Sequence, residues 1–89
     1  MAMYGMDIAQ VQGIQSKIKS AISELQTMIS TLDGQVNALA SAWQGPDATA
    51  FTGTTWPADK GHLNTALTDL QNVDTQLGKE ITQQQTASQ

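Results

Sequence analysis

The sequence predicts an all-α protein: an antiparallel two-helix hairpin with a Trp-x-Gly turn, which dimerises into a four-helix bundle. Two stretches carry apolar residues at spacings of three and four, which is typical of amphipathic helices. Between them, almost at the midpoint of the 89 residues, stands the sequence Trp43-Gln44-Gly45-Pro46. Glycine suits the end of one helix and proline suits the first turn of the next. We therefore expect a single domain over residues 1–89, with its turn at residues 44–46.

The first helix is expected over about residues 7–43. Asp7, followed by Gln10, is a plausible N-cap with a capping-box partner. From Ile22 to Trp43 the apolar spacing alternates between three and four, which is a heptad seam. Asp33-Gly34 could end the helix, but the apolar register continues through it, so we expect one continuous helix. Its residues expected in the hairpin or dimer core are Ile14, Ile18, Ile22, Leu25, Ile29, Leu32, Val36 and Leu39.

The second helix is expected over about residues 47–82. Pro57 lacks a backbone donor and would press on the carbonyl of Gly53, so we expect a distortion near residues 53–57 rather than a clean break. After Pro57 the apolar pattern resumes, and it predicts Leu63, Leu67 and Val73 as core residues. Residues 83–89 are polar with no apolar anchor, which predicts a frayed tail.

The apolar stripe of the first helix is wider than the strip that a single neighbouring helix can cover. The uncovered part would form a long apolar patch, and such patches usually mark interaction surfaces. Pairing two hairpins into a four-helix bundle buries this patch. The sequence therefore predicts at least a dimer.

Composition and motifs exclude several classes of function. The chain has four lysines, no arginine and eight acidic residues, for a net charge of −4, which argues against nucleic-acid binding and against strong binding to anionic membranes. There is no cysteine, zinc-ligand spacing or phosphate loop, and a helical hairpin offers no cleft in which the lone His62 could form a catalytic triad. We therefore expect no enzymatic activity, no metal and no cofactor. Residues 1–6 lack the basic and continuous apolar regions of a Sec signal peptide, so any export would use another route.

The residues around the turn resemble a known family. The stretch Ala42-Trp43-Gln44-Gly45-Pro46-Asp47-Ala48, followed by Phe51 and Trp56, is similar to the actinobacterial form of the motif in WXG (ESAT-6-like) proteins, which leave the cell by type VII secretion. The resemblance covers essentially the whole chain. It implies that Trp43 and Gly45 form the turn motif and that Pro46, Phe51 and Trp56 support the tip.

A second element of the family lies near the end of the chain. Members carry a hydrophobic residue, then an acid four positions later, then hydrophobic residues three and seven positions after the acid. The residues that fit this pattern are Leu70, Asp74, Leu77 and Ile81. Many exported members also carry, close to the C-terminus, a tyrosine followed four residues later by an acid. The only tyrosine here is Tyr4, with Asp7 three residues on.

The missing tyrosine pattern implies, by resemblance, that this chain is the signal-less subunit of a secreted heterodimer. A related WXG subunit would carry the C-terminal signal. Trp43 would lie beside that signal and help to form a surface for the FtsK/SpoIIIE-like ATPase of the secretion system. The protein would thus be secreted without a Sec signal peptide.

Three alternatives remain open from the sequence. The chain could be a homodimeric secreted WXG protein. It could be a structural coiled-coil adaptor that is not exported, in which Trp43 is only a hydrophobic plug at the end of the bundle. A weaker alternative is a secreted effector that perturbs membranes.

Overall fold

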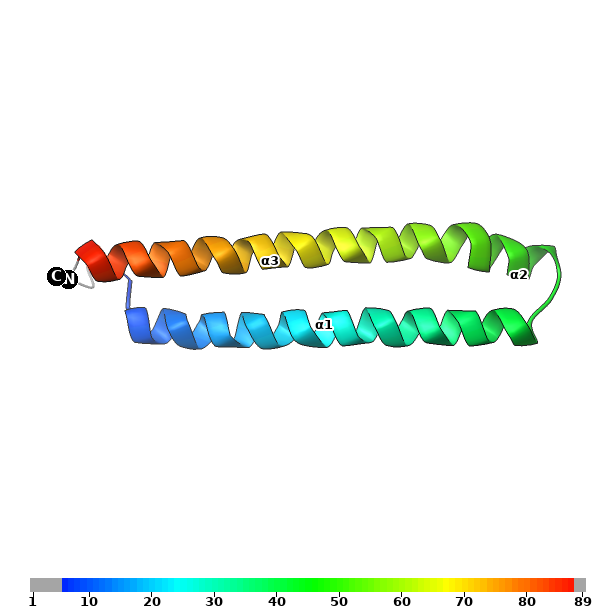
Figure 1. Cartoon of the computed structure of the whole chain (residues 1–89), viewed down its shortest axis with the longest axis horizontal. Coiled ribbons are helices and arrows are strands. Elements are labelled where there is room, and N and C mark those ends of the chain that lie inside the picture. The colour runs from blue at the N-terminus through cyan, green and yellow to red at the C-terminus, as the bar shows by residue number, and fades with distance from the viewer. Residues whose placement is uncertain (1–5, 88–89) are drawn as a thin grey trace.

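The computed structural model describes residues 6–87 as an antiparallel pair of long helices (Figure 1). Helix α1 spans Ile8–Ala42 and helix α3 spans Trp56–Ala87, with helix α2 (Pro46–Ala50) and π-helix η1 (Phe51–Thr55) between them. The molecule is a rod of 65 × 16 × 16 Å, with the turn at one end. This architecture confirms the predicted all-α hairpin.

Helix α1 begins at a side-chain cap and ends where the chain becomes extended. The Oδ1 atom of Asp7 accepts a hydrogen bond from the backbone N–H of Gln10 at 3.1 Å, which satisfies one of the free donors of the first turn. Gly34 does not interrupt the helix. At the other end Trp43 has an extended backbone, with φ −126° and ψ 119°, and its N–H donates to the carbonyl of Leu39 at 2.9 Å.

The turn depends on Gly45, whose φ of +117° lies in a region that residues with a side chain rarely adopt. Pro46 then occupies the first turn of α2, where its missing N–H costs nothing. The π-helix follows, and it closes with the Trp56 N–H donating to the carbonyl of Phe51, five residues back. Helix α3 continues directly from it, so the second half of the hairpin is one rod with a widened turn.

The end of the chain differs from the frayed tail expected at residues 83–89, because α3 remains helical as far as Ala87. Ile81 is buried and Gln84 is half-buried, so the inward-facing side of α3 continues past its last large apolar residue. The remainder of that tail, and the N-terminal residues that include Tyr4, lie outside the described part of the chain.

The core is a single seam between the helices. Among the described residues, five apolar side chains are buried: Ile22, Ile29, Val36, Ala48 and Ile81. A second group is half-buried along the same seam: Ile18, Leu25, Leu63, Leu67 and Leu77. A seam this thin leaves much of the apolar surface of the hairpin uncovered.

Candidate functional site

Large apolar side chains remain exposed along the rod, outside the seam. Met28 is 57% exposed, Val73 is 53% exposed and Ile14 is 47% exposed. The complete set over the helices, which we call the apolar face, is Ile14, Met28, Leu32, Leu39, Leu70 and Val73. Four members of the predicted core, Ile14, Leu32, Leu39 and Val73, therefore lie outside the seam of the hairpin.

Helix geometry places these residues on one side of the hairpin. Several of them, such as Met28 and Val73, come immediately before a seam residue, which rotates them by about 100° in the same sense. Leu39 and Leu70 follow Val36 and Leu67 by three residues, which displaces them toward the same side. Because α1 and α3 are antiparallel, an equal rotation in both helices points to a common face. The exposed apolar side chains therefore gather on one side of the hairpin.

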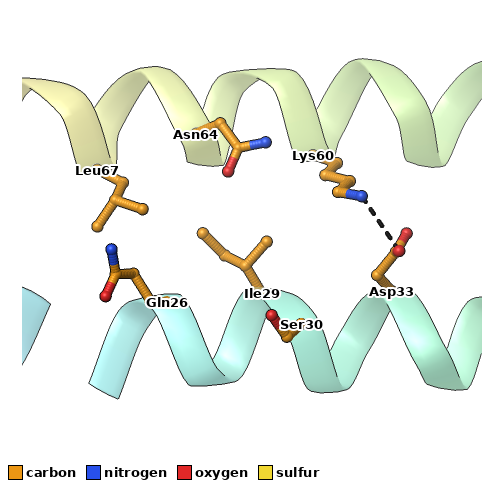
Figure 2. A pocket seen from close by; sticks show the side chains of 7 residues that line it. All are labelled: Gln26, Ile29, Ser30, Asp33, Lys60, Asn64 and Leu67. Atoms are coloured by element: carbon orange, nitrogen blue, oxygen red, sulfur yellow. Dashed lines mark ion pairs between the residues drawn. The ribbon is translucent and has the colours of Figure 1, made fainter. Parts of the chain in front are cut away.

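The opposite side of the hairpin is polar. Several exposed Ser, Thr and Asn side chains come immediately after an inward-facing residue. We call them the polar face: Ser23, Ser30, Asn37, Asn64, Thr68, Thr75 and Thr82. Ser30 of α1 and Asn64 of α3 line one shallow groove of about 420 Å³, whose floor includes Ile29 and Leu67 (Figure 2). That shared groove shows that these positions of the two helices lie on the same face. The hairpin is thus amphipathic as a whole molecule.

The tip combines a packed aromatic pair with an exposed surface. The ring of Trp43 lies 5.9 Å from the ring of Phe51, with the two planes tilted by 47°. Trp43 nevertheless remains 38% exposed. Behind the pair, Ala48 is only 3% exposed and packs the base of the turn. The turn tryptophan can therefore brace the tip and still offer a surface to another molecule.

Trp56, assigned to the tip on sequence grounds, lies in the seam. Its indole N–H donates to Asp33 Oδ1 at 2.9 Å, and Lys60 Nζ lies 3.1 Å from Asp33 Oδ2 (Figure 2 shows the ion pair). The hydrogen bond from Trp56, together with that from Lys60, lowers the pKa of Asp33 below its ordinary value. Trp56 therefore links the start of α3 to the C-terminal half of α1.

The C-terminal pattern also faces α1. Ile81 is buried, Leu77 and Asp74 are half-buried, and Leu70 lies at the edge of the apolar face. Lys19 Nζ lies 2.9 Å from Asp74 Oδ2, and this hydrogen-bonded pair lowers the pKa of Asp74. The geometry gives the acid of the pattern a partner on the other helix.

Sequence reasoning missed the partners of both acids, namely Gln15, Lys19 and Lys60. Asp33 was read only as part of a possible helix break. One signal was available, because Gln15 and Asp33 occupy positions where the periodicity of α1 places seam residues. Choosing their partners required the register of the hairpin, which the periodicity alone leaves open.

These features define a class of protein: a helical hairpin with a tryptophan at its tip and one exposed apolar face, suited to contact with another protein. A family model described as proteins of 100 residues with WXG (WXG100) matches residues 3–86. The chain belongs to the WXG100 family, which confirms the resemblance found around Trp43 and Gly45. No match was found among curated protein sequences or among solved structures.

Family membership carries several general properties. WXG100 proteins are small, helical and secreted, and they typically pair with other WXG proteins. Membership indicates a small substrate of type VII secretion. In the part of the chain that the structure describes, no helix is long and apolar enough to cross a membrane.

Proposed function

We propose that this chain is the signal-less subunit of a heterodimer exported by the type VII secretion system, and that its partner carries the C-terminal secretion signal. The one-sided apolar face is the observation that carries the proposal. Met28, Val73 and their neighbours expose a surface that an isolated hairpin leaves in water. A second hairpin of the same family supplies the matching surface.

The dimensions of the apolar face suit a helical partner. On α1 the face runs from Ile14 to Leu39, a distance of about 38 Å at 1.5 Å per residue. Two hairpins packed through such faces form a four-helix bundle with a core between them. The serine and threonine side chains of the polar face remain in water, so assembly stops at two hairpins.

The choice of a heterodimer rests on the sequence near the end of α3. Residues 70–89 contain no tyrosine, so the tyrosine-containing signal of the family is not found in this stretch. The partner would supply it. The exposed part of Trp43 would lie beside that signal, and the two would form a composite surface for the FtsK/SpoIIIE-like ATPase. The actinobacterial type of the motif stays a prediction.

Co-expression with the neighbouring gene tests the proposal. The chain should purify as a one-to-one complex with a related hairpin, as measured by size exclusion and by the mass of the complex. Its secretion should require that partner. A stable, soluble homodimer that is secreted without any partner would contradict the heterodimer proposal and favour the homodimeric alternative. A soluble chain that pairs but is never exported would favour the structural adaptor.

Substitution of the turn tryptophan separates recognition from packing. Trp43→Ala should leave the helix content of the complex largely intact, because the seam is formed by other residues, while export or engagement of the ATPase is lost. Trp43→Phe is the matched control, since it retains an aromatic ring against Phe51. If Trp43→Ala instead unfolds the hairpin, Trp43 acts as a plug. Circular dichroism and a secretion assay on the same variants distinguish the two results.

A further inference from the structure

Two polar clusters, which we call the inner and the outer clamp, cross the seam between α1 and α3. In each, an aspartate of one helix faces two residues, four positions apart, on the other helix. In the inner clamp, Asp33 of α1 faces Trp56 and Lys60 of α3. In the outer clamp, Asp74 of α3 faces two residues of α1, again four apart.

The outer clamp shares the lysine–carboxylate pair of the inner one, but its second contact is made to the main chain of Asp74. Lys19 Nζ lies 2.9 Å from Asp74 Oδ2, and Gln15 Nε2 donates to the main-chain carbonyl of Asp74 at 3.3 Å. Only 16% of the Asp74 side chain is exposed, against 32% for Asp33. The second carboxylate oxygen of Asp74 is buried without a hydrogen-bond partner. Each clamp thus holds a carboxylate in the seam at a desolvation cost.

The two clamps are related by the approximate twofold symmetry of an antiparallel helix pair. A shift of 41 residues along the sequence converts Gln15, Lys19 and Asp33 into Trp56, Lys60 and Asp74. The clamps stand about 21 Å apart along the rod, since Lys19 and Asp33 are 14 residues apart on one helix. They therefore constrain the same relative position of the helices at two separate points.

The apolar seam by itself specifies that position weakly. On α1, Ile22, Ile29 and Val36 repeat every seven residues, and on α3 the half-buried Leu63 and Leu77 stand two such repeats apart. A slip of one heptad would again bring apolar residues together. The turn does not prevent a slip in which α1 residues pair seven positions later along α3. Unwinding the five-residue α2 and the π-helix would supply the longer loop that this slip requires.

The clamps distinguish the observed register from both neighbouring ones. If each residue of α1 paired seven positions later along α3, Asp33 would face Leu63 and Leu67, and Asp74 would face Ile22 and Gln26. Both carboxylates would lose their lysines, and Asp33 would lie against apolar side chains alone.

A slip in the other direction is no better. Asp33 would face Thr49 and Gly53, and Asp74 would face Ile8 and Gln12. No cation meets either carboxylate in this register. An uncompensated charge in a seam is far more costly than a missing apolar contact.

We propose that the two carboxylate clamps select the register of the hairpin. They add specificity, as a polar residue in a coiled-coil seam does. By fixing the register, they also fix which residues of α1 and α3 stand side by side on the apolar face and where the tip ends. This role concerns the fold of the chain itself and does not depend on the proposed export.

The test measures the register directly. Spin labels are attached to cysteines introduced at Ser23 and Thr82, which are exposed on the polar face of a chain that has no cysteine of its own. Labelled chains are diluted with unlabelled ones so that only distances within a chain are observed. A slip of seven residues changes the offset between the labels by about 10 Å along the rod. The parent protein should give one narrow distance distribution.

The double variant Asp33→Leu with Asp74→Leu should remain helical and gain a second population about 10 Å from the first. Each single variant keeps one clamp and should retain one population. The matched control, Asp59→Leu with Asp69→Leu, removes the same two charges from exposed positions and should also retain one. A single population in the double variant would overturn the proposal.

A second variant keeps the test decisive if the leucine substitutions prevent folding. Asp33→Asn with Asp74→Asn preserves side-chain size and removes only the charge, so the slipped registers lose most of their penalty. It should again show two populations. One population in this variant, on a folded chain, would overturn the proposal as well.

Discussion

At Gly45 the backbone adopts φ +117° and ψ 176°, in a region that is essentially restricted to glycine. A Cβ at this position would meet nothing within 4 Å, so the constraint is conformational rather than steric crowding by neighbours. Gly45→Ala should therefore destabilise the hairpin by about 1–3 kcal/mol, as measured by urea unfolding.

Gly34→Ala is the matched control for that substitution. Gly34 lies inside α1, and a Cβ there also meets nothing within 4 Å. Alanine should stabilise the helix by up to about 1 kcal/mol. Effects of the same sign at the two glycines would contradict a special backbone conformation at Gly45.

Asp33 and Asp74 predict how stability depends on pH. Hydrogen bonds from Trp56 and Lys60 to Asp33, and from Lys19 to Asp74, hold both pKa values below the ordinary value. A carboxylate with a lowered pKa in the folded state stabilises the fold above its unfolded pKa of about 3.9, and this contribution is lost as the pH falls through the folded pKa. The thermal midpoint should thus be insensitive to these groups near neutral pH and should drop in acid below about pH 4.

The variant Asp33→Asn with Asp74→Asn provides the comparison for the acid response. Its thermal midpoint should fall less steeply than that of the parent over the same acidic range, because the two titrating groups are gone. Parallel curves for the two proteins would mean that other carboxylates account for the acid response.

The same residues show what the sequence could and could not predict. Trp43 and Gly45 could be identified from the sequence because a turn is specified by neighbouring residues, here an aromatic residue, a glycine and a proline. The hydrogen bond between Asp33 and Trp56 could not be predicted in this way. It joins residues 23 positions apart, and only the register of the folded hairpin brings them together. The sequence therefore marked Asp33 only as a possible helix break and Asp74 only as part of the C-terminal pattern, without a partner for either.

At the scale of the elements, the π-helix η1 allows two residues whose spacing does not fit a regular α-helix to face the same side. Ala48 and Trp56 both face inward but stand eight residues apart, which overshoots two α-helical turns by about 80°. A π-helical turn absorbs one extra residue and restores the phase. The sequence pointed to a distortion because of Pro57, whereas the required phase depends on how α2 packs at the tip.

Pro57→Ala tests whether the π-helix is caused by the proline or by the spacing between Ala48 and Trp56. We expect the π-helix to persist, because alanine restores a donor without changing the spacing between Ala48 and Trp56. The hydrogen bond from Trp56 to Phe51 should remain detectable by amide hydrogen exchange or NMR. Conversion of residues 51–55 into a regular α-helix would assign the distortion to the proline.

The end of α3 illustrates another limit of periodicity. Residues 83–87 contain no large apolar side chain, so the pattern gave no reason to extend the helix. In the structure the inward side continues through Gln84, and the hydroxyls of Thr82 and Thr86 donate to carbonyls four residues earlier. A half-buried polar residue can continue a helical face that hydrophobicity alone does not reveal.

For the whole molecule, the separation of the apolar face from the polar face determines how the hairpin can bind a partner, more than the size of its core does. The hairpin is a rod 65 Å long with one thin seam, and large apolar side chains stay exposed along it. A lone hairpin of this kind gains stability by docking, because binding that requires the folded state shifts the folding equilibrium. Fold and partner are thus coupled in one equilibrium.

The final prediction concerns which face the partner covers. Met28→Asp with Val73→Asp places two charges on the apolar face, where full burial of each native side chain would contribute about 1.5–3 kcal/mol. The double variant should weaken the complex with the partner hairpin on the order of a hundredfold or more. Ser30→Asp with Thr75→Asp adds the same charge to the polar face and should leave the complex intact. Size exclusion with mass measurement after co-expression decides between them, and loss of the complex only in the polar-face variant would place the partner on the opposite side of the hairpin.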